Sequence, residues 1–447
     1  MARGEVAVVL FTRDLRVHDH PALAEAARQA RRVVPLFVFD REILAGEFAA
    51  ANRLAFMLAA LGDLRASLRR RGADLVVRHG DPVHEAVRLA SAHGAGAVHA
   101  TADVSEHARR RQERLRRACA AHRLELRLLP GVTVVPPGEL HPSGGGDHYR
   151  VFTPYWRAWS AQRWRAPAPA PRALALPDGL DPGPLPALAD LARGEVSPDL
   201  VPGGEAAGRR RWHAWRRRGL AAYADRHDDL PGDRTSRIGP YIHFGCLSPL
   251  ELATGALDGP GGEAFARQLC WRDFHHQVTA AFPAIARRDY RPARRAWRSD
   301  AAGLAAWKQG RTGWPIVDAG MRQLRAEGWM HNRARLIVAS FLVKDLGVDW
   351  RLGAAHFLDW LVDGDVANNS GNWQWVAGTG NDTRPNRVLN VLRQADRHDP
   401  AGDYVRRYVP ELAGIAGSAV HRPWALDDDR RRRLDYPAPL VDPARPR

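Results

Sequence analysis

The chain has 447 residues, 45% of them hydrophobic, which is enough to bury a sizeable core and to form two or three domains. Its formal net charge of +16 favours a polyanionic partner. The preference for arginine over lysine fits such a partner and a GC-rich genome equally well. Three cysteines without C-x-x-C spacing, and no apolar run long enough to span a bilayer, argue against a disulfide scaffold, a structural zinc site and a membrane protein. We therefore expect a soluble, cytoplasmic chain with no metal site.

The first 135 residues alternate short apolar runs with amphipathic segments rich in Ala and Arg. The expected strands are Val6–Thr12, Val33–Phe39, Asp74–Arg78, Ala97–Ala100 and Glu125–Leu129. Helices are expected between them, for example over Pro21–Ala30 and Ala51–Arg71. This β-α-β alternation predicts an α/β domain with a doubly wound parallel sheet over residues 1–135. No G-x-G-x-x-G follows the first strand, so a Rossmann dinucleotide site is not expected there.

Residues 136–208 are expected to connect two domains. From Trp164 to about Gly208 the chain is rich in Pro, Ala and Leu and shows little periodicity, which is uncommon inside one compact domain. From Arg209 to Arg406 the apolar residues recur with a period near 3.6, so an all-α domain is predicted over residues 209–447. The charged tail Asp427–Arg447 is expected to be solvated.

The stretch Asp363–Trp375 reads D-G-D-V-A-N-N-S-G-N-W-Q-W. Asp and Asn are rarely buried without a partner, whereas Trp is usually buried. Acids and amides interleaved with large aromatics therefore indicate a wall around a planar ligand with polar edges. A tryptophan-capped loop with its own turn chemistry is the alternative.

Tryptophan is unevenly distributed, because the first 150 residues contain none. Nine of them crowd into part of the helical half: Trp271, Trp297, Trp307, Trp314, Trp329, Trp350, Trp360, Trp373 and Trp375. Aromatic side chains serve as stacking platforms for bases, as walls of cofactor sites or as electron paths. Each tryptophan taken alone could simply pack in the core. The nine together favour one of these functional roles.

A second polar cluster, Trp329–Arg335, reads W-M-H-N-R-A-R in a helical context. On a helix Asn332 and Arg335 are three residues apart and share a face, whereas Arg333 points elsewhere. One cation could pair with an acid of Asp363–Trp375, and another could reach a phosphate. Solvated helix charges are the alternative.

A third polar segment, Thr235–Pro240, reads T-S-R-I-G-P and precedes an expected helix. Its hydroxyl groups and backbone N–H groups suit a phosphate or a diphosphate. An ordinary helix N-cap has the same composition, so this signal is weak by itself.

Several longer motifs follow one another along nearly the whole chain. They are T-R-D-L-R (Thr12–Arg16) with Asp19, Y-R-V-F-T-P-Y-W (Tyr149–Trp156), T-S-R (Thr235–Arg237), W-R-D-F (Trp271–Phe274), T-G-W-P-I-V-D-A-G-M-R-Q-L (Thr312–Leu324) and G-W-M-H-N-R (Gly328–Arg333). In this order they resemble the photolyase/cryptochrome family, specifically its microbial class I cyclobutane pyrimidine dimer photolyases. The resemblance implies light-driven repair, in which excited reduced flavin adenine dinucleotide (FAD) donates an electron to a dimer flipped out of DNA and the dimer splits.

The resemblance also implies which residues of the helical domain hold FAD. The positions for its phosphates and ribityl chain are Tyr223, Thr235, Ser236, Arg237, Ile238 and Gly239. The positions beside the flavin and the adenine are Arg335, Asp363, Gly364 and Asp365. Asn369 stands where the family places a residue facing the flavin N5 atom, and a neutral amide there favours repair over signalling.

Three tryptophans match the family's electron-transfer chain. Trp373 would lie nearest the flavin, followed by Trp350 and then by Trp297 near the surface. Electron transfer along them would restore the reduced flavin, so it is accessory to the repair step.

The resemblance places further residues at the DNA lesion. They are Gln268, Trp271, Asn332, Arg333, Leu336, Trp375 and His227. A damaged dimer stacks poorly and is therefore less costly to flip out, while a basic rim supplies affinity independent of sequence. Damaged DNA is the expected partner of a monomeric protein without an obligate protein partner.

The chain departs from the family pattern at three positions. Gln268 replaces a common Glu and cannot supply its negative charge, which bears on repair efficiency. Leu336 replaces a common Met of similar volume, and Asn390-Val391 replaces Asn-Pro.

Three rival functions are weighed against repair of cyclobutane dimers. A cryptochrome-like photoreceptor predicts a long extension after Tyr436-Pro437, which this sequence lacks. A (6-4) photoproduct photolyase predicts paired histidines where His331-Asn332 stands. A plain DNA-binding protein explains neither Asn369 nor the ordered tryptophans.

The N-terminal domain of this family often holds a second, light-harvesting chromophore. Either 8-hydroxy-5-deazaflavin or 5,10-methenyltetrahydrofolate is expected. A GC-rich composition typical of actinobacteria, which make deazaflavins, favours the first.

Overall fold

A computed structural model describes residues 4–192, 194–292, 296–381, 384 and 387–444. The chain divides into two compact units. The first unit comprises Met1–Glu195, Val201–Ala221 and Ser236–Ala284, and the second comprises Val196–Leu200, Ala222–Thr235 and Ile285–Arg447.

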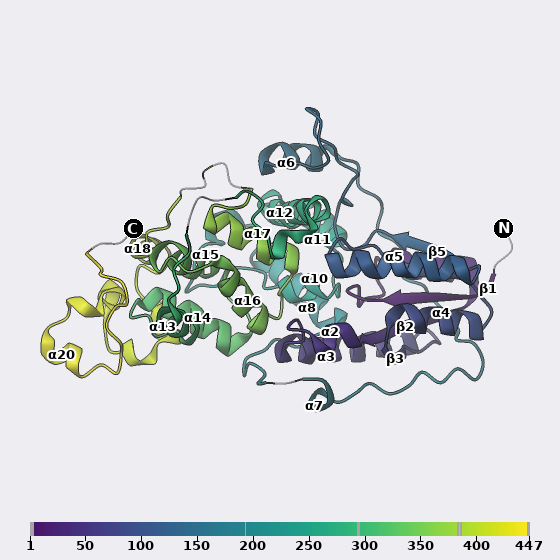
Figure 1. The fold of residues 1–447 in the computed structure, drawn as a ribbon, viewed down its shortest axis with the longest axis horizontal. Coiled ribbons are helices and arrows are strands. Elements are labelled where there is room, and N and C mark those ends of the chain that lie inside the picture. The colour runs from purple at the N-terminus through teal and green to yellow at the C-terminus, as the bar shows by residue number, and fades with distance from the viewer. Residues whose placement is uncertain (1–3, 193, 293–295, 382–383, 385–386, 445–447) are drawn as a thin grey trace. The chain divides into compact units, whose positions relative to one another are not determined.

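The first unit is built on a five-stranded parallel sheet (Figure 1). Its strands are β1 (Gly4–Phe11), β2 (Ala30–Asp40), β3 (Val76–Gly80), β4 (Ala95–Thr101) and β5 (Glu125–Leu129), in the spatial order β3-β2-β1-β4-β5. All five expected strands are present, so the predicted doubly wound sheet is confirmed. A strand covered on both faces needs apolar residues throughout, and every side chain of β1 from Val6 to Phe11 is buried.

Helices cover this sheet and continue beyond it within the first unit. They are α1 (Pro21–Gln29), α2 (Arg41–Ala45), α3 (Ala51–Arg69), α4 (Pro82–Ala92), α5 (Glu106–Ala121), α6 (Phe152–Ala161), α7 (Leu188–Leu191), α8 (Glu205–Arg218), α10 (Gly239–His243), α11 (Pro249–Leu257) and α12 (Gly262–Ala281). Local chemistry sets their starts. Asp81, for example, caps α4 by accepting a hydrogen bond from Val83 N at 2.8 Å, and Pro82 takes the first helical position.

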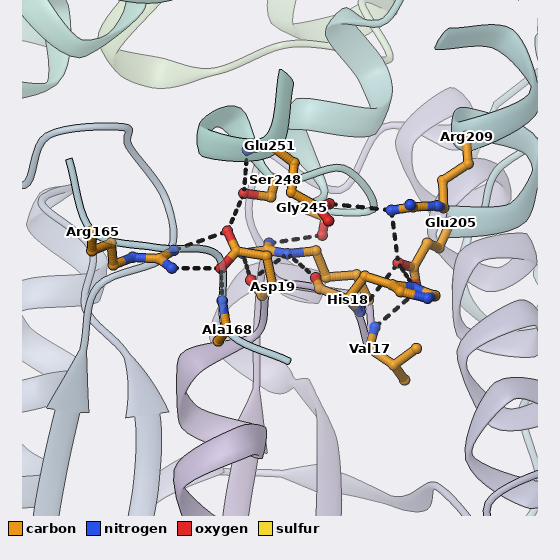
Figure 2. Close-up of polar contacts among 11 residues, drawn as sticks. Val17, His18, Asp19, Arg165, Ala168, Glu205, Arg209, Gly245, Ser248 and Glu251 are labelled. Atoms are coloured by element: carbon orange, nitrogen blue, oxygen red, sulfur yellow. Dashed lines mark hydrogen bonds and ion pairs between the residues drawn. The ribbon is translucent and has the colours of Figure 1, made fainter. Parts of the chain in front are cut away.

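A buried polar cluster at the end of β1 joins segments that are distant in sequence (Figure 2). Asp19 has a left-handed backbone, with φ of 45°, and its carboxylate is fully buried. The carboxylate accepts hydrogen bonds from Arg165 Nη2 at 2.9 Å, from Ala168 N at 2.8 Å and from the Ser248 hydroxyl. Burial alone would raise the pKa of Asp19, but the hydrogen bond from Arg165 and the charges of Arg16 and Arg165 hold it below its usual value.

Glu205, the first residue of α8, extends the same cluster (Figure 2). Its carboxylate accepts from Val17 N at 2.8 Å and from His18 N at 3.2 Å. Arg16 Nη1 donates to Gly245 O at 3.0 Å, just before α11. These bonds fix α8, α10 and α11 to the segment between β1 and α1, so the first unit extends well past residue 135. The expected division at residues 135 and 208 follows the sequence pattern and stays a prediction.

The second unit is helical. It contains α9 (Tyr223–Arg226), α13 (Ala301–Gln309), α14 (Pro315–Glu327), α15 (Asn332–Ser340), a π-helical turn (Phe341–Asp345), α16 (Trp350–Trp360), α17 (Val366–Ala377), α18 (Val391–His398), α19 (Asp403–Tyr408) and α20 (Asp428–Arg432). Short 3₁₀ turns lie at Pro283–Ala286, Pro410–Leu412, Gly417–His421 and Pro423–Ala425. Trp307, Trp314 and Trp350 are buried in its core, and the Trp307 indole N–H donates to Val338 O at 2.9 Å. An α/β part followed by a helical part confirms the predicted fold class.

The C-terminal tail differs from the expectation. The charged residues of α20 are exposed, as predicted for a solvated tail. Tyr436, however, donates its hydroxyl to the buried carboxylate of Asp318, and Leu440 N donates to Thr312 O at 2.9 Å. The prediction of a solvated tail is wrong for this segment, because a buried carboxylate needs donors and the tail supplies one.

Candidate functional site

A pocket in the second unit gathers side chains from α15, α16, α17 and the residues just before α17. Eight residues singled out from the sequence line it together: Asn332, Arg335, Leu336, Asp363, Gly364, Asp365, Asn369 and Trp373. Phe357, Leu361 and Val376 add apolar wall, and Asn368 and Asn372 add further amides. The predicted combination of polar edge and aromatic wall is therefore present in one place.

A charge pair stands at the polar side of this pocket. Arg335 Nη2 lies 2.9 Å and 3.1 Å from the two carboxylate oxygens of Asp363, and Arg335 Nε donates to Met330 O at 2.8 Å. This confirms that one cation of the Trp329–Arg335 cluster pairs with an acid of Asp363–Trp375. Because both partners are partly accessible, with side-chain exposures of 24% and 11%, they keep hydrogen-bonding capacity for a ligand.

Asp365 begins α17 as its N-cap. Its carboxylate accepts from Asn368 N at 2.9 Å and from Asn368 Nδ2 at 2.6 Å. Asn369 lies one helical turn further along and donates its amide to Ala354 O at 3.0 Å. This bond fixes the orientation of an uncharged amide in the wall of the pocket.

Trp373 closes the apolar side of the pocket. Its ring meets Phe357 edge-on at a centroid distance of 5.0 Å, and its buried indole N–H has no acceptor among the described residues. Gly353 of α16 makes this packing possible, since a Cβ there would lie 2.2 Å from Trp373 Cη2.

The other two tryptophans of the expected chain lie in the same core. Trp350 is fully buried, and its indole N–H donates to Asp289 Oδ1 at 2.9 Å, with the guanidinium carbon of Arg351 4.8 Å from its ring centre. Trp297 packs against this core and is only partly buried. Trp373 and Trp350 are both buried and Trp297 is partly exposed, which agrees with the expected place of Trp297 near the surface; the electron path itself stays a prediction.

The remaining residues of the second unit that are expected to contact the lesion lie outside the pocket lining. Arg333 pairs with Asp228, and His227 Nδ1 approaches Tyr223 O at 2.9 Å. Trp375 is half-buried, with the guanidinium of Arg387 5.2 Å from its ring centre. A cation over an indole is favourable and is typical of surfaces that bind stacked bases.

In the first unit, α12 carries the other two residues that are expected to contact the lesion. Gln268 is exposed, and Trp271 stacks on Phe152 at a centroid distance of 3.6 Å and an interplanar angle of 4°. Two residues further along, Asp273 is fully buried and its Oδ2 accepts from Val134 N, Val135 N and the Trp159 indole at 2.9–3.0 Å. Burial raises the pKa of Asp273 to about 6, because the charge of Arg272 and the hydrogen bonds from these uncharged donors compensate only part of the desolvation.

The residues expected to hold phosphates belong partly to the first unit and partly to the second. Tyr223 and Thr235 belong to the second unit; Thr235 Oγ1 donates to Asp233 Oδ1 at 3.1 Å. Ser236, Arg237, Ile238 and Gly239 belong to the first unit and lead into α10. Asp233 and Arg237 have positive φ angles of 43° and 52°, a conformation in which successive N–H groups can turn toward an anion.

Sequence reasoning missed several residues that complete these sites. They are Phe152 beneath Trp271, Asp228 beside Arg333, Asp289 beside Trp350 and Gly353 beside Trp373. Each of these residues is identified by a side-chain contact in the structure and not by its spacing from another residue in the sequence. Only Phe152 carried a signal, since it lies within the Tyr149–Trp156 motif.

The described residues contain no group of three or more His, Cys, Asp or Glu side chains placed to hold a metal ion. Among the same residues, no helix is both long enough and apolar enough to cross a membrane.

Comparison with known proteins gives matches over nearly the whole chain. Residues 7–172 match the family model for DNA photolyase, and residues 265–447 match the model for the FAD binding domain of DNA photolyase. A deoxyribodipyrimidine photo-lyase of Streptomyces griseus is 54% identical over 99% of this chain and 97% of its own length.

Two solved structures share the fold. A bacterial class III photolyase from Agrobacterium tumefaciens has a TM-score of 0.92 at 31% identity, covering 99% of this chain and 96% of its own. An archaeal photolyase from Sulfolobus tokodaii with two FAD molecules has a TM-score of 0.86 at 29% identity, covering 98% of this chain and 96% of its own.

Proposed function

The chain belongs to the photolyase/cryptochrome family, and we propose on that basis that it is a deoxyribodipyrimidine photo-lyase, a light-driven enzyme that splits cyclobutane pyrimidine dimers in DNA. The observation that carries the proposal is the 54% identity to a photo-lyase over nearly all of both chains. The pocket around Asn369 supports it, because residues of the expected types meet there. We also assign the chain to class I, on its motifs, and expect a cytoplasmic monomer.

The second unit's pocket fits FAD. Its apolar wall suits a planar ring, the Arg335–Asp363 pair and the amides suit its polar edge, and the buried Trp373 N–H lacks an acceptor among the described residues. When bound and reduced, FAD supplies the electron that light transfers to the dimer. Asn369 would present a neutral amide toward the flavin, and the residues Tyr223, Thr235, Ser236, Arg237, Ile238 and Gly239 would hold the phosphates and ribityl chain.

The chain's own residues would bind and orient the lesion. Trp271, backed by Phe152, offers a rigid face on which a flipped base can stack, and Trp375 offers another. Gln268, Asn332, Arg333, Leu336 and His227 would complete the contacts. Gln268 is exposed and can donate and accept hydrogen bonds, but it cannot stabilise positive charge as a carboxylate does.

Trp373, Trp350 and Trp297 would return electrons to the pocket. The Asp289 carboxylate on the Trp350 indole N–H favours positive charge on that ring, which suits an electron donor.

We further propose a second chromophore in the first unit, 8-hydroxy-5-deazaflavin in preference to 5,10-methenyltetrahydrofolate. A pocket beyond the carboxyl ends of β2 and β3, lined by Asp40, Glu42, His107, Arg110, Arg111 and Arg114, lies where open α/β sheets bind ligands. Its arginines suit an ionised hydroxyl or a glutamate tail, so an absorption spectrum of the purified protein is needed to separate the two chromophores.

The function is tested with a duplex in which a dimer blocks a restriction site. Blue light on the reduced protein should restore cleavage of the duplex, and the same mixture in the dark should not. Unchanged blockage in the light, with flavin bound and reduced, would sink the proposal.

A further inference from the structure

Arg333, the second residue of α15, is held by an acid from another segment of the second unit. Its Nε donates to Asp228 Oδ1 at 3.2 Å and its Nη2 to Asp228 Oδ2 at 2.5 Å, in a two-pronged fork. Its Nη1 donates to Gln394 Oε1 of α18 at 3.4 Å. Three of the five guanidinium N–H groups thus have acceptors within the protein.

The pair is partly buried and electrically balanced. The Arg333 and Asp228 side chains are 20% and 27% exposed. Burial alone would raise the pKa of Asp228, but the hydrogen bond and the charge of Arg333 hold it below its usual value, so the carboxylate is ionised at neutral pH. Burial, and then the charge of Arg333, lower the pKa of the neighbouring His398, which leaves that ring uncharged. His227 Nε2 lies 3.8 Å from Asp228 Oδ1.

A cation adds affinity for any DNA only when it can neutralise a phosphate. A phosphate that approaches Arg333 must displace Asp228 or lie beside its negative charge. A base flipped out of DNA is instead expected to meet Asn332 and Leu336, which lie on the same helix as Arg333. The extra contacts of an extruded lesion can offset the loss of the fork, whereas undamaged DNA makes no such contacts.

We propose that Asp228 is a specificity-determining residue, which withholds the Arg333 cation from undamaged DNA while leaving it beside Asn332 and Leu336, the expected lesion contacts. The inference rests on the proposed function and deepens it, because it names a residue that sets the preference for damaged over undamaged DNA. Asp228 acts through Arg333 and is not itself a catalytic residue.

The test substitutes Asp228→Asn in the full flavin-loaded chain, with Asp229→Asn as the matched control. Asp229 loses the same charge one residue away; its carboxylate accepts from Gly232 N at 3.1 Å and forms no ion pair with Arg333 in the described part of the chain. Binding is measured in the dark to undamaged and dimer-containing duplexes of one sequence, at several salt concentrations.

Relative to the control, D228N should tighten binding to the undamaged duplex about threefold to tenfold and steepen its salt dependence by about one phosphate contact. Binding to the dimer-containing duplex should change less, so the preference for damage falls. Equal binding by D228N and D229N, or weaker binding of D228N to undamaged DNA, overturns the proposal.

Arg333→Gln gives an independent arm that stays informative if D228N loses its flavin. Because R333Q leaves the Asp228 carboxylate without its cation, binding to the undamaged duplex should weaken up to about threefold, and binding to the damaged duplex, which also loses the Arg333 contact, should weaken about tenfold or more. Equal losses on both duplexes overturn the role of Asp228. A wild-type protein that neither prefers dimers nor repairs them contradicts the proposed function instead.

Discussion

The polar cluster around Asp19 in the first unit and the pocket around Asn369 in the second use similar residue types and differ in how completely they are paired. The Asp19 carboxylate is fully buried, and three donors from two distant segments converge on it. Such a cluster has little capacity left for a ligand, so it holds the fold.

The pocket is less complete. Arg335 and Asp363 pair with each other yet stay partly exposed, and the Trp373 indole N–H has no acceptor among the described residues. Donors and acceptors left with capacity next to an apolar wall are what a polar-edged ligand requires. The comparison therefore separates residues that stabilise the protein from residues that are available to bind a ligand.

The largest effect is expected at Asp19. Asp19→Ala leaves the buried Arg165 contact without its anion and places a Cβ-bearing residue other than Asp or Asn at φ 45°, so the free energy of unfolding should fall by about 3–5 kcal/mol. Asp19→Asn keeps an acceptor and tolerates this backbone, so it should cost clearly less. Urea denaturation compares the two variants, and equal losses would remove the special role of the carboxylate.

Asp273 sharpens the comparison, because its buried carboxylate has mainly uncharged donors. Burial raises its pKa to about 6 in the folded protein, against 3.8 as the ordinary value. The folded state therefore binds more protons than the unfolded state between these values, and the free energy of unfolding should fall as pH rises from about 4 to 6, by up to about 3 kcal/mol. Asp273→Asn should remove this slope from urea-unfolding data collected across the range. An unchanged slope would assign it to another group.

Within the pocket, Gly353→Ala should disturb function more than its size suggests. The added Cβ would lie 2.2 Å from Trp373 Cη2, so the indole must move, at a cost of about 1–3 kcal/mol. Light-driven reduction of bound flavin should slow while the sheet of the first unit stays intact by circular dichroism. Unaltered photoreduction would argue against Trp373 as the residue next to the flavin.

The smallest effect on stability is expected for Asp363→Asn. The pair with Arg335 is partly exposed, so its loss should cost under about 1 kcal/mol of unfolding free energy. Flavin affinity, measured by release of flavin fluorescence, should nevertheless fall about tenfold, because Arg335 loses its orientation. Loss of stability without loss of flavin would reverse the assignment of this pair.

The sequence predicts regular elements and local pairs better than distant ones. The apolar run Val6–Phe11 suffices to predict β1, and the three-residue spacing on α15 suffices to align Asn332 with Arg335 along the pocket. Asp228 and Arg333 are 105 residues apart, and neither periodicity nor composition links them. Long-range partners of this kind depend on how helices pack, which single-sequence patterns do not encode.

The Asp363–Trp375 stretch contains features that its sequence predicts and one feature that it does not. Its composition predicts a wall of polar and aromatic side chains, and residues of both kinds line one pocket; a ligand in that pocket stays a prediction. Its local structure, a helix that starts at Val366 with Asp365 as N-cap, could have been predicted from the Asp preceding an apolar residue. The buried indole of Trp373 could not, because it depends on the absence of a side chain at Gly353 in another helix.

The central claim is tested most directly by the absorbance of ultraviolet-irradiated oligothymidylate, which rises when cyclobutane dimers revert to thymines. With the reduced, flavin-loaded protein, the absorbance should recover under blue light, stop when the light is turned off and resume when it returns. No recovery under illumination, with the flavin still bound and reduced, would contradict the assignment of this pocket to light-driven dimer repair.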